Sequence, residues 1–403
     1  MIRDTAHGAG RNPAGGGSRP DRRGPLSGVR VVELAGIGPA PFACMMLADM
    51  GADVLRVDRI RADGSDDWWL AHDILSRGRR SVAIDLKCPD GVDLVLDLCD
   101  AAEAFVEGFR PGVAERLGLG PDVIEARNPR LVYGRMTGWG QDGPLAAKAG
   151  HDINYCAVTG ALHAIGAAGG PPVPPLNLLG DFGGGGMLLA FGLACALLEA
   201  RQSGRGQVVD AAMIDGVSLL MAWTHTLRNA GQWTDQRGDN ILDGAAPNYA
   251  VYETADGRHV ALGAMEPQFF SRLLRRLGLP PELAADAGDR AAWPEVRQRL
   301  AAAFRLRTQE QWVDFFAGDD VCLAPVLSMA DAAEHPHLRA RGVLRPTAGG
   351  HQPAAAPRFS RSVPGEPDGP TMPGAGGAQV LAEWGIGPER IGKLREKAAV
   401  RIG

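Results

Sequence analysis

The chain contains few cysteines and no close pair of them. Only six of its 403 residues are Cys, and the two nearest in sequence, Cys88 and Cys99, lack the two-residue spacing of redox and zinc pairs. Most cysteines lie in apolar stretches, where a free Cys behaves as a small hydrophobic side chain. This pattern indicates no metal site, and it predicts a reducing compartment, namely the cytoplasm.

The sequence also lacks an excess of positive charge and a long apolar run. Lys and Arg total 42 against 47 Asp and Glu, and nucleic-acid binding requires a basic domain or stripe, so no such partner is expected. The longest apolar run, over residues 187–198, is shorter than the roughly 20 residues that span a bilayer. There is no polybasic run and no signal-peptide pattern, so we expect no membrane partner.

Glycine and proline are abundant, with 55 Gly and 29 Pro, and they help to divide the chain. Residues 1–24 combine Gly and Arg with almost no large apolar side chains, which predicts a disordered extension. Residues 25–230 predict a large α/β domain, and residues 245–340 predict a smaller α+β domain. Residues 341–403 form a C-terminal segment that contains a Pro/Gly linker.

The large domain opens with a βαβ pattern. A strand over residues 29–34, a helix over 42–50 and a strand over 52–58 together predict a parallel sheet. Apolar stretches predict three further strands, over residues 81–86, 101–107 and 131–136. Two long apolar helices are predicted, over residues 184–201 and 208–230.

The turn after the first strand resembles a dinucleotide-binding fingerprint but does not complete it. Gly36 and Gly38 have the expected spacing, yet Pro41 stands where a third Gly would allow close helix packing. Asp58 lies at a distance typical of the residue that binds a ribose hydroxyl. From these residues alone, a nucleotide site and a plain βα turn both remain open.

Basic residues gather near the predicted strand ends. They are Arg59, Arg77, Arg79, Arg80, Lys87 and Arg110. Ligands collect at the carboxyl ends of parallel strands, where several cations can hold a polyphosphate. The alternative is a solvated charged surface, which is the better interpretation of any one of these residues taken singly.

Three residues are candidates for acid–base chemistry. His151 follows a Gly-rich loop, Asp181 precedes a run of glycines and a predicted helix, and Glu266 lies between a predicted strand and a helix. Backbone N–H groups at such a helix start, around Gly183 and Gly184, can stabilise an oxyanion beside a proton-transferring carboxylate. The alternatives are a structural His and a helix-capping Asp.

Several short motifs are spread along the chain between about residue 24 and residue 360. They are EGFRPG at 107–112, TGWGQ at 137–141, GHDINY at 150–155, GDFGG at 180–184 and GQVVDAAM at 206–213. Together they resemble the family III CoA-transferase superfamily and, within it, the α-methylacyl-CoA racemases. His151 and Glu266 favour the racemases, because the transferases typically carry Tyr and a Gly-rich loop at these places.

The resemblance implies racemisation of 2-methylacyl-CoA thioesters through an enolate. It makes His151, supported by Glu266, one acid/base unit and Asp181 the other. It also implies a set of CoA-binding residues, with the phosphates near three arginines and the adenine near an isoleucine: Arg59, Arg77, Arg110 and Ile37. No cofactor is implied, because CoA is part of the substrate.

The resemblance further implies an interlocked homodimer. A Rossmann-like large domain with a parallel sheet, built from the N-terminal part and the returning C-terminal segment, would meet the small α+β domain of the other subunit. Two other functions remain open. One is a CoA-transferase that moves CoA between carboxylic acids with Asp181 as nucleophile, and the other is an inactive CoA-binding or scaffold protein.

Overall fold

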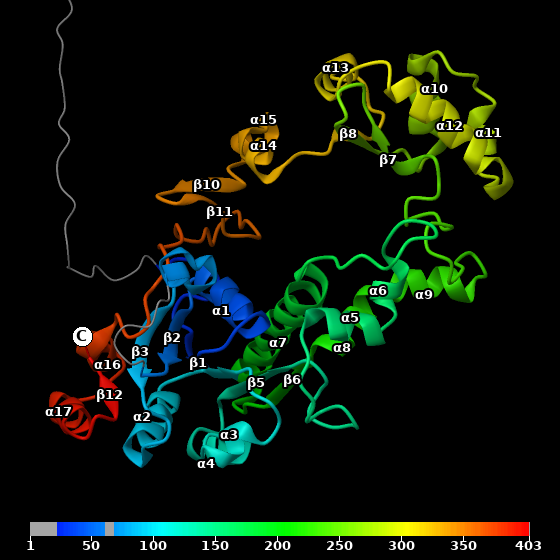
Figure 1. The fold of residues 1–403 in the computed structure, drawn as a ribbon. Coiled ribbons are helices and arrows are strands. Elements are labelled where there is room, and N and C mark those ends of the chain that lie inside the picture. Colours follow the sequence, from blue (N-terminus) through cyan, green and yellow to red (C-terminus); the bar gives the residue numbers. More distant parts are fainter. Residues whose placement is uncertain (1–21, 61–67, 403) are drawn as a thin grey trace, which may run out of the picture.

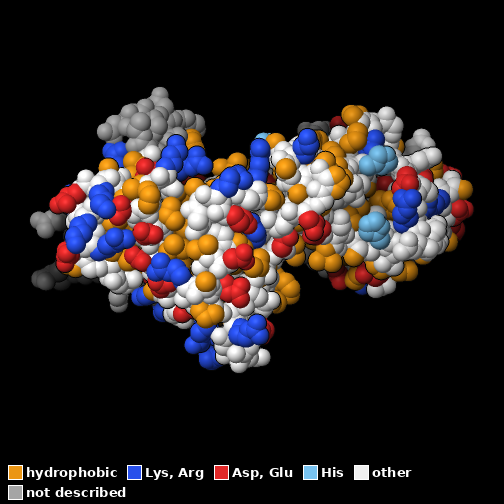
Figure 2. Space-filling view, turned by 90° about the horizontal axis from the view of Figure 1, so that it is seen from below, with side chains coloured by type: hydrophobic (Ala, Val, Ile, Leu, Met, Phe, Trp, Pro, Cys, Tyr) orange, Lys and Arg blue, Asp and Glu red, His pale blue; other side chains and the backbone are white. Residues whose placement is uncertain are grey.

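The computed structural model describes residues 22–60 and 68–402, so most of the extension predicted over residues 1–24 lies outside the described residues. An α/β domain and a smaller lobe are joined by two segments of chain (Figure 1). The α/β fold class with a largely parallel sheet, predicted from the sequence, is confirmed. On the face shown in Figure 2, acidic and basic side chains are interspersed, in keeping with the small net charge.

Within the described ranges, seven strands form the main sheet, in the order β12-β3-β2-β1-β4-β5-β6. Their bounds are β1 (Arg30–Leu34), β2 (Asp53–Asp58), β3 (Arg80–Ile84), β4 (Ala104–Glu107), β5 (Val132–Thr137), β6 (Val208–Ala212) and β12 (Val400–Arg401). Neighbouring strands are parallel except for β12, which pairs antiparallel with β3. The strand order reverses between β1 and β4, and ligands of such sheets bind at that point.

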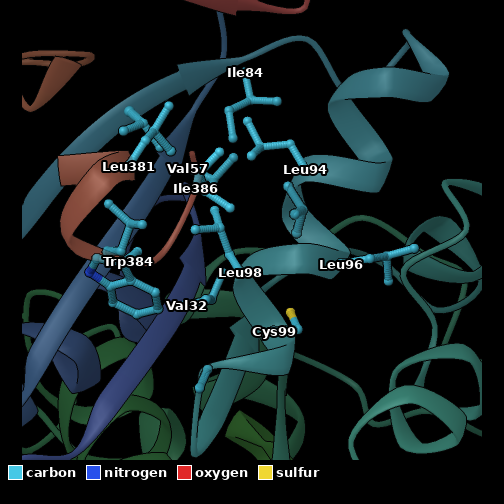
Figure 3. Close-up of a cluster of buried hydrophobic side chains, with 14 of the residues drawn as sticks. Val32, Val57, Ile84, Leu94, Leu96, Leu98, Cys99, Leu381, Trp384 and Ile386 are labelled. Carbon is cyan, nitrogen blue, oxygen red and sulfur yellow. The ribbon is translucent and has the colours of Figure 1, made fainter. Parts of the chain in front are cut away.

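Helices bury an apolar cluster on each face of the sheet. On one face, α2 (Pro89–Asp100) packs with the C-terminal helices α16 (Gly377–Glu383) and α17 (Pro388–Glu396). Figure 3 shows Leu94 and Leu98 of α2 in the same buried cluster as the C-terminal Leu381 and Trp384. On the other face lie α1 (Pro39–Asp49) and α7 (Leu188–Ser203). The last segment of the chain therefore completes the core of the first domain.

The segment predicted as one helix over residues 208–230 contains a strand and two helices. Val208 and Val209 belong to β6, which pairs with β5, and the helices α8 (Met213–Leu220) and α9 (Ala222–Asn229) follow. The prediction was wrong because a short, mostly apolar stretch does not by itself distinguish a strand from a helix. Pairing with β5 decides in favour of the strand.

The preceding helix begins earlier than its predicted start at residue 184. A π-helical segment, η3 (Leu178–Met187), runs directly into α7. Together they span Leu178–Ser203, long and apolar enough to cross a membrane by length and composition. Leu189, Leu193 and Leu197 are nevertheless buried against the sheet, an arrangement equally typical of a helix in a protein core.

Short helices complete the α/β domain. They are α3 (Val113–Arg116), α4 (Pro121–Arg127), α5 (Asp152–Val158) and α6 (Ala161–Ala164), with the 3₁₀ turns η1 (Trp68–His72) and η2 (Ile74–Ser76). Of these, α5 follows the cavity-lining loop after β5. It therefore bears directly on the candidate site.

The smaller lobe has its own antiparallel sheet and its own core. The sheet consists of β7 (Tyr249–Glu253), β8 (His259–Gly263) and β9 (Leu323–Pro325). The helices are α10 (Pro267–Leu277), α11 (Leu283–Asp286), α12 (Trp293–Phe304) and α13 (Gln309–Phe315), with the 3₁₀ turn η4 (Arg290–Ala292). Phe270, Phe304 and Trp312 lie in its buried cluster.

The chain then returns to the α/β domain. The elements on the way are α14 (Met329–Glu334), α15 (Pro336–Arg341), β10 (Leu344–Thr347) and β11 (Gly350–Pro353). Pro353 reaches the α/β domain, because its carbonyl accepts a hydrogen bond from Arg77. The return ends with β12 at the edge of the main sheet.

Candidate active site

A cavity of about 480 Å³ lies at the carboxyl ends of β1, β4 and β5. The turn after β1, the loop after β4 and the end of β5 form part of its wall, and the starts of α5 and η3 bring His151 and Asp181 to it. The cavity thus occupies the ligand-binding point of a parallel sheet. Two of the three predicted acid–base residues line it.

Asp181 is half-buried in the first turn of η3. Asn177 donates a hydrogen bond from Nδ2 to Oδ2 of Asp181 (3.4 Å). Burial raises the pKa of the Asp181 carboxyl above its ordinary value; the Asn177 bond opposes this rise, the Asp152 carboxylate adds to it, and His151 opposes it. A carboxyl with a raised pKa is suited to take up and return a proton near neutral pH.

Asp152 is a site residue to which the sequence patterns gave no role. This nearly buried residue begins α5, and its Oδ2 accepts a hydrogen bond from the backbone N–H of Asp181 (2.7 Å). A Cβ at Gly180 would lie 2.4 Å from the same oxygen, so the close approach depends on a glycine there. Asp152 therefore ties the start of α5, beside His151, to the turn that carries Asp181.

His151 is exposed immediately before α5. Its backbone N–H donates to Oδ1 of Asn154 (3.0 Å), which fixes the entry into the helix. On the next turn of α5, Tyr155 also lines the cavity. Its ring fills the space left by Gly138, where a Cβ would lie 2.0 Å from the Tyr155 Cζ atom.

Tyr155 is close enough to two charged groups to respond to them. Burial raises the pKa of the Tyr155 hydroxyl, the Asp181 carboxylate adds to the rise, and Arg110 opposes it. The wall of the cavity therefore combines a basic group from the loop after β4 with an acidic group from η3.

The glycines that follow Asp181 lie inside the helix rather than at its start. A Cβ at Gly184 would lie 2.7 Å from the backbone nitrogen of Val217 in α8, and one at Gly185 would lie 2.8 Å from Cβ of Pro39 in α1. These glycines permit η3 to pack closely against two helices. The predicted role of Gly183 and Gly184 as helix-terminal donors to an oxyanion is therefore not met.

The predicted CoA-binding residues have different positions. Ile37 and Arg110 line the cavity, and both are exposed. Arg59 is exposed just after β2, outside the lining. Arg77 is buried, and its guanidinium pairs with Asp49 (2.6 Å) and donates to the carbonyl of Pro353 (2.5 Å). The prediction that Arg77 binds a phosphate is wrong, because its charge is already neutralised inside the protein.

Glu266 lies away from this cavity in its own chain. It is the exposed residue that precedes α10 in the smaller lobe, whereas His151 and Asp181 belong to the α/β domain (Figure 1). One chain therefore does not bring the three predicted acid–base residues together. Among the described residues, no group of three or more His, Cys, Asp or Glu side chains is arranged to hold a metal ion.

A family model described as CoA-transferase family III matches residues 26–378. The chain belongs to CoA-transferase family III. The family recognised from the motifs is therefore confirmed. A solved family relative, a CAIB/BAIF family protein from Brucella suis, matches with a TM-score of 0.76 at 26% identity, covering 90% of this chain and 100% of that one.

Two curated family relatives share a higher identity with this chain. The α-methylacyl-CoA racemase of Mus musculus is 43% identical over 380 residues, which cover 93% of this chain and 97% of that protein. The α-methylacyl-CoA racemase of Homo sapiens is 43% identical over 319 residues, covering 79% of this chain and 81% of that protein. Within family III, the chain is thus similar to racemases over nearly its whole length.

Proposed function

We propose that this family III protein is an α-methylacyl-CoA racemase, which inverts the configuration of 2-methylacyl-CoA thioesters at the carbon next to the thioester. The observation that carries the proposal is the placement of His151 and Asp181 in one cavity at the carboxyl ends of the strands. The 43% identity to two racemases supports the same reaction.

The two side chains account for inversion without rotation of an intermediate. One takes the α-proton as a base, which leaves a planar enolate, and the other donates a proton to the opposite face as an acid. The reverse reaction exchanges these roles, and the total number of protons on the pair is the same in both arrangements. Because burial raises the pKa of Asp181, its carboxyl can hold a proton closer to neutrality. Each positioned acid/base group contributes about 10²–10⁴-fold to the rate.

For the CoA part of the substrate, we propose contacts with Arg110 and Ile37. Arg110 forms no ion pair with any other described residue, so its guanidinium can donate to a phosphate. Ile37 presents an exposed apolar side chain at the rim of the cavity, suited to the face of an adenine ring. CoA enters as part of the substrate, and the proposed reaction needs no other cofactor.

We propose that the protein works as an interlocked homodimer in the cytoplasm. Glu266 would then reach the cavity of a second copy, which its distance from the cavity in its own chain supports. The turn before η3 and the helical segments α5, η3, α7, α8 and α9 expose many large apolar side chains: Val158, Leu176, Leu178, Met187, Phe191, Leu198, Leu219, Leu220 and Trp223. A surface of this kind marks an association site. The six cysteines, all free, fit a reducing compartment.

The test is exchange of the α-hydrogen. We expect the protein to incorporate deuterium from D₂O at C2 of a 2-methylacyl-CoA and to equilibrate its two epimers without an added carboxylic acid. Asp181→Asn and His151→Gln should each lower the inversion rate by about 10²–10⁴-fold while leaving CoA binding within about threefold. His163→Gln, the same change at a His outside the cavity, is the matched control and should retain the wild-type rate.

The same assay separates the alternatives. Transfer of CoA to an added acid, with no exchange at C2, would instead support a CoA-transferase with Asp181 as nucleophile. The absence of both exchange and transfer would support an inactive CoA-binding protein. Wild-type inversion in either the Asp181 or the His151 variant would contradict the two-base mechanism.

A further inference from the structure

Glu107 is a buried carboxylate directly below the cavity, and the proposed mechanism does not use it. It is the last residue of β4, at the centre of the sheet, and its side chain is 1% exposed. Its Oε2 accepts a hydrogen bond from the backbone N–H of Phe109 (2.6 Å), and its Oε1 accepts one from Nε of Arg135 on β5 (3.1 Å). The carboxylate thus folds back over the end of its own strand.

The two hydrogen-bond partners of Glu107 lie in different parts of the domain. Phe109 belongs to the loop of residues 108–111, which lines the cavity and carries the exposed Arg110. Arg135 belongs to the rigid interior of the sheet. A Cβ at Gly108 would lie 3.4 Å from Cβ of Ala40 in α1, so this loop also runs close to the helix that follows the β1 turn. Glu107 therefore anchors the cavity loop to the sheet through one bond on each carboxylate oxygen.

The surroundings of Glu107 control its charge. Arg135 faces it from β5 and also bonds Glu115 of α3 (2.9 Å), while the Tyr133 hydroxyl lies within electrostatic reach on β5. Burial raises the pKa of the Glu107 carboxyl to about 7, although the Phe109 and Arg135 bonds oppose the rise; Glu115 adds to it. The carboxylate is therefore ionised above this pH and protonated below it.

We propose that Glu107 is a positioning residue that holds the loop of residues 108–111, and with it Arg110, in place for the CoA part of the substrate, and that neutralising Glu107 weakens CoA binding. Hydrogen bonds to an ionised acceptor are roughly twice as strong as neutral ones, and protonation also removes the ion pair with Arg135. The inference rests on the proposed function only in taking the cavity to be the CoA site. The proposed proton transfer by His151 and Asp181 does not depend on Glu107.

The test measures equilibrium binding of free CoA by titration calorimetry between pH 5.5 and 8.5, in parallel with KM and kcat for inversion. We expect the Kd of the wild type to rise as the pH falls through about 7, because Glu107 becomes protonated there. Glu107→Gln should raise Kd and KM about tenfold at pH 8, change kcat less than about twofold, and remove that part of the pH dependence. Titration of the CoA phosphate is common to both proteins, so the difference between their profiles isolates Glu107.

Glu115→Gln is the matched control. It makes the same chemical change at the other partner of Arg135, which is 43% exposed. Its Kd at pH 8 should equal that of the wild type. Its pH dependence should persist but move to lower pH, because the Glu115 carboxylate no longer adds to the pKa of Glu107. Equal profiles for the wild type and Glu107→Gln, or a loss confined to kcat, would overturn the proposal. If Glu107→Gln did not fold, the wild type would be titrated with 3′-dephospho-CoA, which lacks the titrating phosphate monoester, and a pH-independent affinity for this ligand would overturn the proposal. Binding without inversion would count against the racemase function and leave this inference standing.

Discussion

Five arginines near the ends of β2, β3 and β4 form two groups that the sequence does not distinguish. Arg77, Arg79 and Arg80 precede or begin β3, and their guanidinium groups pair with Asp49, Glu33 and Asp53, respectively. Arg59 and Arg110 follow β2 and β4 and remain exposed. The first group holds the domain together from within, and the second faces solvent at the ends of the strands where ligands bind.

This difference shows that an arginine near a strand end indicates a phosphate site only if no carboxylate of the protein already pairs with it. Each partner of the buried group lies at least twenty residues away along the chain, and no local pattern announces it. A guanidinium already neutralised by a buried carboxylate has little left to offer a phosphate. Three substitutions test how far this division extends.

The largest effect is expected at the buried pair of Arg79 and Glu33. Arg79→Met leaves the Glu33 carboxylate in an interior from which solvent is excluded, and breaking such a pair costs about 3–5 kcal/mol. Urea-induced unfolding should shift accordingly, while KM of the remaining folded protein should not change. Arg127→Met, which breaks a partly exposed pair with Asp97 and Asp100, is the control and should cost less than about 1 kcal/mol.

An intermediate effect is expected at Arg110, and it should appear in binding rather than in stability. Arg110→Ala removes a guanidinium that lines the cavity and pairs with no carboxylate among the described residues, so KM for the acyl-CoA should rise at least about tenfold. The urea midpoint should stay at the wild-type value. A shifted urea midpoint with an unchanged KM would show that Arg110 stabilises the fold, as Arg77, Arg79 and Arg80 do, rather than binding the substrate.

The smallest effect is expected at Arg59. This exposed residue lies outside the cavity lining, and charges farther than about 8 Å from a ligand are largely screened at physiological salt. Arg59→Ala should therefore change KM less than about threefold in 0.15 M salt. A tenfold rise in KM that persists at high salt would instead show direct contact with a phosphate, as the resemblance to the family implied.

Much of the fold could be predicted because its signals are local. The first βαβ unit carries a Gly-Pro turn between two apolar strands, and β1, α1 and β2 lie within a few residues of their predicted bounds. The segment over residues 208–230 could not be resolved, because its apolar run fits both a strand and a helix. The pairing of β6 with β5 decides it, and that contact is long-range.

The candidate site divides in the same way. His151 and Asp181 stand in motifs, and both line the cavity. Gly183 and Gly184 were predicted to donate hydrogen bonds to an oxyanion, because the sequence shows the glycine run but not which helix packs against it. In the fold, α8 packs against both glycines. Asp152 and Glu107 were not assigned a role, since each acts through a hydrogen bond to the backbone of another residue.

The antiparallel strand β12, at the edge of the main sheet, has a consequence for folding during synthesis. β12 and the helices α16 and α17 are synthesised after the smaller lobe, yet they cover β3 and α2, which are synthesised before it. Domains generally fold as units during synthesis. Here the nascent α/β domain leaves part of its apolar face uncovered until the segment that carries Trp384 has been synthesised. A chain that stopped near residue 370 would therefore lack β12 and expose the apolar side chains that Leu381 and Trp384 cover.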